Sequence, residues 1–202
     1  IKVNGGLGII NSRLSVEGPI IKDKLTFYAG ARSTYSDWVL KLLSNYDLQQ
    51  SSVRFYDVNA KIDYNINAKN KITAFGYLSN DYFDYYQNAR YGYGNLIGSI
   101  KWNQIMSKSS SGVLTANISR YNSDIVDFTA KNYEYNLNTS IEQEQLAYHF
   151  STNFIPRHKI NAGLSAVRYN VEPGSSSPFD DKSAAMFVDI SDEQAFEGAV
   201  YL

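Results

Sequence analysis

The chain has 202 residues, with 19 basic and 20 acidic side chains and a formal net charge of −1. This balance argues against a nucleic-acid binder, which needs a basic surplus for its phosphate contacts. The sequence holds no apolar run long enough for a transmembrane helix, and the absence of Cys excludes disulfides, thiolate metal sites and cysteine nucleophiles.

The residue composition favours an all-β protein. Aromatic residues make up 14% of the chain, with 17 Tyr and 10 Phe, whereas charged residues make up only 19%. An excess of Tyr together with Asn and Ser is typical of strands joined by polar turns. Two interpretations stay open at this point. One is a soluble all-β domain, and the other is an outer-membrane barrel, in which Tyr and Trp collect at the two bilayer interfaces.

Period-two alternation is clearest from Tyr56 to Tyr64, where apolar residues at even positions alternate with Asp, Asn and Lys. Strand geometry therefore places an apolar row on one face and a charged row on the other. The phase of alternation is ambiguous at 72–79 and 113–121. In chain order, strands are predicted at Ile10–Glu17, Leu25–Arg32, Tyr56–Tyr64, Ile72–Ser79, Leu96–Asn103, Val113–Tyr121, Tyr133–Ile141, Leu146–Phe154, Ile160–Val171 and Ala195–Leu202.

The predicted connections fall into two length classes that alternate along the chain. The short ones are Ile20–Lys24, Ile66–Lys71, Met106–Gly112 and Pro156–Lys159. The long ones are Ser36–Ser52, Asn80–Gly94, Asn122–Lys131 and Pro173–Asp192. An outer-membrane barrel sorts its connections in this way, with short turns on the periplasmic side and long loops outside.

Two segments also have helical character. Ser36 is placed to cap a helical turn in the first long connection, with Trp38, Val39, Leu42 and Leu43 on one face. The segment Asp192–Val200 is compatible with a helix, although a strand fits its place in the series better.

No enzymatic motif is present. Gly92–Gly98 only approaches a dinucleotide fingerprint, because the last glycine spacing is wrong and no βαβ unit follows. His149 lies on the predicted polar side of its strand and His158 in a short turn, and nothing pairs them into a metal site. We therefore expect no enzymatic activity, no cofactor and no metal.

Aromatic residues are concentrated in the predicted loop Asn80–Gly94. A dense set of rings in an exposed loop is a candidate ligand surface. The alternative is that the rings extend an aromatic girdle or pack one loop against another. The candidate ligand-binding residues are Tyr82, Phe83, Tyr85, Tyr86, Arg90, Tyr91 and Tyr93.

The segment Asn4–Tyr35 contains Glu17-Gly18-Pro19-Ile20, Lys22-Asp23-Lys24 and Arg32-Ser33-Thr34-Tyr35. With these motifs it resembles TonB-dependent outer-membrane receptors of the Bacteroidota type. The resemblance continues through Tyr56–Asp81 and Tyr93–Gln104 and, more weakly, through Asn153–Gly174. These sequence motifs are typical of the barrel domain of such receptors, and barrel motifs carry little information about the ligand.

The resemblance implies an antiparallel up-and-down transmembrane β-barrel of the 22-strand type, of which residues 1–202 would form about the first nine or ten strands. The plug and the C-terminal strands are expected to lie outside these residues. The implied function is TonB-dependent nutrient uptake across the outer membrane of a Gram-negative bacterium. The implied partners are outer-membrane lipid, the protein's own plug domain, the TonB complex through the plug region and an unidentified small ligand.

In that setting the charged residues of the polar face would face the barrel lumen and contact the plug, whereas in a soluble sheet they would form an ordinary solvated face. They are Arg13, Glu17, Arg32, Asp57, Lys61, Asp63 and Lys101. Two other functions remain open: a complete small porin-like barrel, and a soluble carbohydrate-binding or adhesion β-sandwich. The β-sandwich predicts a chain that stays soluble without detergent.

Overall fold

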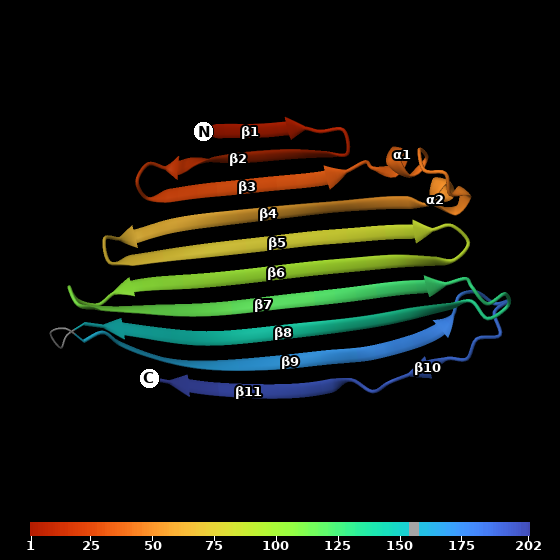
Figure 1. The fold of residues 1–202 in the computed structure, drawn as a ribbon. Coiled ribbons are helices and arrows are strands. Elements are labelled where there is room, and N and C mark those ends of the chain that lie inside the picture. Colours follow the sequence, from red (N-terminus) through yellow and green to blue (C-terminus); the bar gives the residue numbers. More distant parts are fainter. Residues whose placement is uncertain (154–157) are drawn as a thin grey trace.

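The computed structural model describes residues 1–153 and 158–202, and most of them lie in β-strands (Figure 1). The strands are β1 (Lys2–Leu7), β2 (Asn11–Ile21), β3 (Leu25–Thr34), β4 (Ser52–Asn67), β5 (Asn70–Tyr85), β6 (Ala89–Ile105), β7 (Ser110–Asp127), β8 (Tyr135–Thr152), β9 (Ile160–Pro178), β10 (Val188–Asp189) and β11 (Glu193–Tyr201). Two short helices, α1 (Asp37–Leu40) and α2 (Tyr46–Gln50), lie between β3 and β4. No helix among the described residues is long and apolar enough to cross a membrane.

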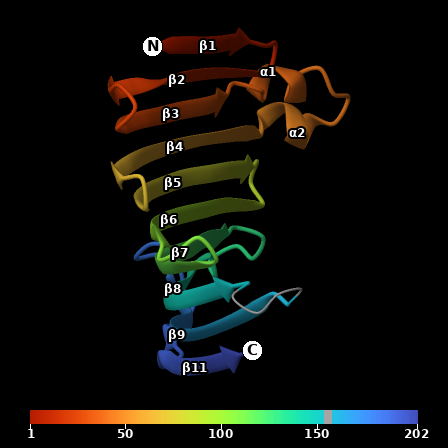
Figure 2. The same ribbon diagram turned by 90° about the vertical axis from the view of Figure 1, so that its left-hand side faces the viewer.

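The strands form one 11-stranded sheet in which each strand from β1 to β9 pairs antiparallel with the next along the chain. β11 pairs over its whole length with the outer edge of β9, and β10 pairs with the same edge near the end of β9. Figure 2 shows these strands in a single layer. The predicted all-β, antiparallel, up-and-down architecture is confirmed, but the described sheet is open, since β1 does not pair with β11. A sandwich would need two packed sheets, which the described residues do not form.

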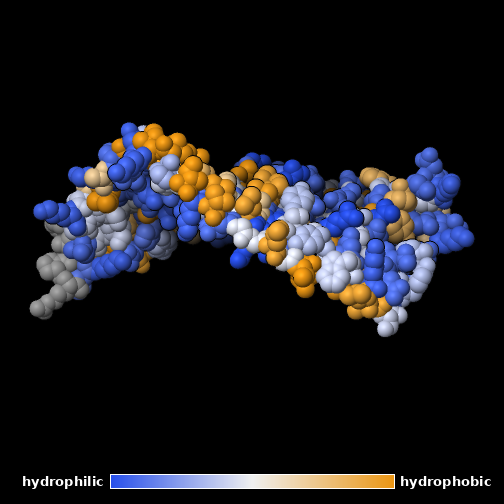
Figure 3. All heavy atoms as spheres, turned by 90° about the horizontal axis from the view of Figure 1, so that it is seen from above, coloured by the Kyte–Doolittle hydropathy of each residue, from blue (hydrophilic) through white to orange (hydrophobic). Residues whose placement is uncertain are grey.

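The sheet has almost no hydrophobic core. Among the described residues, Ala89 and Val167 are the buried hydrophobic ones, and no large side chain is fully buried. Isolated folded domains bury an apolar face against a second layer, and here that layer is missing. Figure 3, which looks down on the β1 edge, shows hydrophobic side chains in a stripe across the surface between hydrophilic ones.

The strand register defines two chemically different faces, because directly opposed residues in an antiparallel pair share a face. The apolar face carries the even-numbered residues of β4 from Tyr56 to Tyr64, and the polar face carries Asp57, Asn59, Lys61 and Asp63. The register also fixes the phases that the sequence left open. Ile72, Ala74 and Leu78 of β5 lie on the apolar face, as do Leu114, Ala116 and Ile118 of β7.

The connections lie at two opposite ends of the sheet. The turn end holds the connections 22–24, 68–69 and 106–109, together with the end of β8 and the beginning of β9. The helix end, named for α1 and α2, holds 8–10, 35–51, 86–88, 128–134 and 179–187. Three of the four predicted short turns are confirmed, while Pro156 of the fourth lies outside the described residues, as does Phe154 of a predicted strand.

The prediction of a long loop at Asn80–Gly94 is wrong. β5 continues to Tyr85 and β6 begins at Ala89, so a three-residue turn joins them, with Gln87 in the left-handed region at φ 55°. The contrast between short and long connections is therefore weaker than predicted. The separate strands predicted at Tyr133–Ile141 and Leu146–Phe154 are also wrong, since β8 runs unbroken from Tyr135 to Thr152.

The N-terminal and helical predictions need smaller corrections. β1 was not among the predicted strands, yet it pairs with β2 over its whole length. The helix predicted after Ser36 exists as α1, but it ends at Leu40, and the Ser36 side chain does not cap it. The strand predicted at Ala195–Leu202 is confirmed as β11, and the helical alternative for Asp192–Val200 is wrong.

Candidate functional site

The polar face gathers all the charged residues that the sequence placed on it. Arg13 lies opposite Arg32, which lies opposite Asp57, and Glu17 shares a row with Lys61 through Tyr28. The same register puts Asp63 and Lys101 on either side of Thr73. Their location on one face is therefore confirmed. Their contact with a plug stays a prediction.

One ion pair on this face joins Arg32 and Asp57. The Arg32 Nε donates to Asp57 Oδ2 at 2.7 Å, and the Asp57 side chain is only 12% exposed. The Arg32 guanidinium also lies 5.0 Å from the centroid of the Phe55 ring. A charge-assisted hydrogen bond and a cation–π contact hold this guanidinium, while the Arg32 side chain stays 51% exposed.

Closer to the turn end, Asp63 organises a second polar cluster. Its carboxylate accepts a hydrogen bond from Thr73 at 2.6 Å and pairs with Lys61 at 3.0 Å and Lys71 at 3.1 Å. Further along the sheet, a ladder of side chains runs across three strands, with Ser99 donating to Asn117 at 2.7 Å and Asn117 to Gln145 at 2.9 Å. The polar face is therefore a hydrogen-bonded surface rather than a set of free charges.

The Tyr-rich segment forms part of this face, although not as a loop. Phe83 stacks on Tyr85 with ring centroids 6.0 Å apart and on Tyr91 with centroids 6.2 Å apart, at interplanar angles of 11° and 14°. Tyr93 stacks on Tyr121 of β7 at 6.4 Å. We call these five rings the aromatic surface. They are half-buried and occupy the part of the polar face nearest the helix end.

Strand alternation separates the remaining members of the predicted ligand set from the aromatic surface. Tyr82 and Arg90 lie on the apolar face, where both contact the Asp84 carboxylate, Tyr82 by a hydrogen bond at 3.3 Å and Arg90 by an ion pair at 3.2 Å. Tyr86 lies in the turn, with its ring edge-on to Tyr46 of α2 at 5.9 Å. The neighbouring hydroxyl of Tyr46 raises the pKa of Tyr86 above its usual range.

Two aromatic residues of this region were missed in the sequence analysis. Tyr121 completes a stack with Tyr93, and Phe55 supports Arg32. Their only sequence signal is their phase within a strand, which shows the face on which a ring lies but not its neighbour. Knowing the neighbour requires the strand register.

The two histidines do not form a metal site. His149 lies on the polar face, as predicted, and its Nδ1 lies 2.6 Å from the Tyr201 hydroxyl of β11. His158 lies in the connection between β8 and β9. In the part of the chain that the structure describes, no three His, Cys, Asp or Glu side chains gather closely enough to hold a metal ion.

Together these features define an amphipathic, single-layer antiparallel sheet protein with an exposed apolar face and a hydrogen-bonded, partly aromatic polar face. Comparison of the chain with models of protein families, with curated proteins and with solved structures finds no match. Function is therefore inferred from the two faces of the sheet.

Proposed function

We propose that this chain forms part of the wall of an outer-membrane β-barrel that takes up a nutrient as a TonB-dependent receptor. The observation that carries the proposal is the exposed apolar face. Ile62 is 45% exposed, Leu96 52% and Ile100 58%, all on the apolar face. Water-soluble monomers rarely expose continuous apolar patches beyond a few hundred Å², whereas a lipid bilayer covers such a face.

The backbone of the sheet suits the same environment. A chain that crosses a bilayer must satisfy its backbone polar groups internally, and strands do so by pairing with neighbours on both sides. β2 to β8 are paired on both edges. In the proposed barrel, further strands would pair with the free edges of β1 and β11.

The helix-end boundary of the apolar face runs obliquely to the strands. It lies at Leu96 on β6, at Ile118 on β7 and at Leu146 on β8, which is directly opposite Ala166 of β9. At about 3.3 Å per residue and about 4.8 Å between strands, the boundary shifts by about 13 Å over about 14 Å of sheet. This corresponds to a tilt of about 40°, within the range of strands in membrane barrels.

Charged side chains on the apolar face lie just beyond this boundary, toward the helix end. Arg120 lies directly opposite Leu96 and pairs with Glu142 at 3.2 Å, and Glu144 lies opposite Ile118 and pairs with Arg168 at 3.6 Å. An oblique apolar band with ion pairs along its margin is expected where strands leave the hydrocarbon layer and enter the polar interface.

The polar face would then line the lumen. Its charged residues would contact the plug, and the aromatic surface would lie on the side from which ligand enters, because the helix end carries the longest connection. Aromatic rings offer rigid contact area for a ligand. The chain would act by binding and transport, with no chemistry on the ligand.

Membrane insertion is tested by the fluorescence of Trp102, which lies on the apolar face at the turn end. In a Trp38→Phe variant, Trp102 is the remaining tryptophan. We expect brominated phosphatidylcholine to quench its emission strongly, because the ring would contact acyl chains. As the control, Tyr77→Trp in a chain without the native tryptophans places the reporter on the polar face, where aqueous acrylamide should quench and brominated lipid should not. Equal quenching of both reporters by brominated lipid would contradict the assigned faces.

Energy coupling is tested in whole cells that carry the complete protein. Nutrient uptake through a TonB-dependent receptor should stop when the inner-membrane proton gradient is collapsed, whereas diffusion through a porin-like barrel should continue. If uptake continues after the gradient is collapsed and Trp102 is still quenched by brominated lipid, the result would favour the small porin-like barrel instead.

A further inference from the structure

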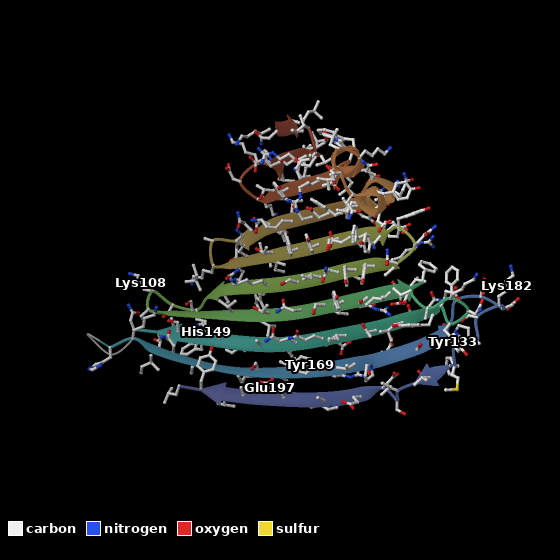
Figure 4. The ribbon with its side chains drawn as sticks, turned by 45° about the vertical axis from the view of Figure 1, so that its right-hand side comes forward. Lys108, Tyr133, His149, Tyr169, Lys182 and Glu197 are labelled. Carbon is white, nitrogen blue, oxygen red and sulfur yellow. The ribbon has the colours of Figure 1, made fainter. Side chains whose placement is uncertain are left out.

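The two ends of the sheet differ strongly in charge. Acidic side chains outnumber basic ones at the helix end, where Asp37, Asp47, Asp81, Asp84, Asp124, Asp127, Glu134, Asp180 and Asp181 lie together with Lys41, Arg54, Arg90, Lys131 and Lys182. Lysines predominate at the turn end, in or next to its turns, and we call the following set the turn rim: Lys22, Lys24, Lys69, Lys71 and Lys108. Figure 4 shows Lys108 and Lys182 at opposite ends of the sheet.

A hollow of about 800 Å³ lies between the β2–β3 turn and the β4–β5 turn. Its lining includes Lys22, Lys24, Lys69 and Lys71 but only one carboxylate, that of Asp23, together with asparagine amides and isoleucine side chains. Lys71 is partly neutralised by Asp63 at 3.1 Å. Lys22 and Lys69 form no ion pair within the described residues, so the hollow carries a net positive charge.

The turn rim adjoins the end of the apolar face. Lys24 Nζ lies 5.8 Å from the centroid of the Tyr64 ring, which ends the apolar row of β4. On β6 the corresponding residue is Trp102, whose indole nitrogen donates to Asn70 Oδ1 at 3.1 Å. Tyr and Trp beside Lys at the end of an apolar row form the arrangement that anchors a protein at a membrane–water interface.

We propose that the turn rim binds the headgroups of anionic phospholipids. This inference rests on the proposed membrane location of the apolar face and adds a lipid preference at one margin of it. The lysine ammonium is a compact donor that pairs with phosphate oxygens. Lysines at a membrane surface are attracted to anionic lipid, with an effect of about fivefold in affinity for each residue.

The spacing of the lysines favours a lipid surface over a single phosphate or an acidic peptide. The turns that carry Lys22, Lys69 and Lys108 are each two strands apart, a separation of about 10 Å. One phosphate group cannot bridge such distances, whereas a row of neighbouring headgroups matches them. The adjoining Tyr64 and Trp102 would contact the acyl chains of the same lipids, a contact that an acidic peptide does not require.

The test compares two variants that each remove three positive charges. The rim variant is Lys22→Gln, Lys24→Gln, Lys69→Gln, and the matched control at the helix end is Lys41→Gln, Lys131→Gln, Lys182→Gln. Binding is measured by flotation with vesicles of phosphatidylcholine, with and without phosphatidylglycerol. We expect the unmodified protein and the control to bind the anionic vesicles at least about tenfold more tightly, and the rim variant to lose that preference.

Four outcomes would overturn the proposal. Equal loss in both variants would mean that net charge alone matters, and an unchanged preference in the rim variant would place the lipid contact elsewhere. Competition by inorganic phosphate that abolishes the preference would indicate a phosphate pocket instead of a lipid surface. Quenching of Trp102 by brominated phosphatidylcholine is recorded in the same samples. Normal quenching without any anionic preference would refute the headgroup site alone, whereas no quenching in any vesicle would refute the proposed function.

Discussion

Replacing Gly163 by Ala should loosen strand β11 from the sheet and lower the free energy of unfolding by about 0.2–1 kcal/mol, the contribution of one cross-strand pair. Gly163 lies on β9 between His149 of β8 and Tyr201 of β11. The Tyr201 ring lies across this glycine, where an added Cβ would overlap its ring atoms. The ring continues to His149, whose Nδ1 lies 2.6 Å from the Tyr201 hydroxyl. A methyl group at Gly163 would push the ring away and break that contact.

Gly198→Ala is the matched control, because a Cβ at Gly198 of β11 meets no heavy atom within 4 Å. Unfolding by urea should show a lower midpoint for Gly163→Ala and little change for Gly198→Ala. Combining Gly163→Ala with Tyr201→Ala should cost less than the sum of the two single changes, since the overlap is then gone. Full additivity in this cycle would show that Tyr201 does not depend on the glycine.

The same pairing of a tyrosine with a glycine recurs on the apolar face. Tyr148 of β8 covers Gly112 of β7, where an added Cβ would overlap the phenol ring. An aromatic ring that covers a glycine on a neighbouring strand replaces the missing side-chain contacts there. Such pairs join residues far apart in the chain, so no local sequence pattern shows them.

Local alternation was sufficient to predict the faces of the sheet. The apolar row from Tyr56 to Tyr64 and the polar row between them lie on opposite faces, because side-chain direction in a strand has a period of two and depends on no distant residue. The same holds for Arg32 and Lys101, whose face followed from their immediate neighbours.

Strand ends were harder to predict because the ends of these strands are polar. β5 and β6 continue through Asn80, Asp81 and Gly94, residues that normally signal a turn. In β8, Glu142 and Glu144 interrupt the apolar row, so one long strand was interpreted as two. Pairing with both neighbours keeps these residues extended, which shows that tertiary context overrides local propensity.

For the candidate site, the sequence therefore predicted the residue types but not their positions in the fold. The residue types of the aromatic surface were visible in the sequence, but their location in a loop was wrong, and their division between the two faces depends on where the turn falls. A turn centred on Gln87 puts Phe83 opposite Tyr91. Moving the turn by one residue would change every such pair.

Replacing Ala60 by Arg should cause a larger loss, about 2–4 kcal/mol of stability in the membrane. Ala60 is the central residue of the apolar row of β4, equally distant along the strand from Tyr56 and Tyr64. It lies opposite Ala29 on one side and Gly76 on the other, so small side chains flank it and offer no charged or polar partner. In the proposed barrel, an arginine there would hold its charge near the middle of the hydrocarbon layer.

Asn59→Arg is the matched control, since it introduces the same side chain one residue away on the polar face. There the guanidinium would stay hydrated, with the Asp57 carboxylate on the same face of the strand. Both variants are compared by urea unfolding of the protein folded in phosphatidylcholine vesicles, with the fraction that inserts measured separately. We expect Ala60→Arg to insert poorly and unfold at lower urea, and Asn59→Arg to behave almost as the unmodified protein. Equal tolerance of the two arginines would mean that neither face of β4 contacts lipid.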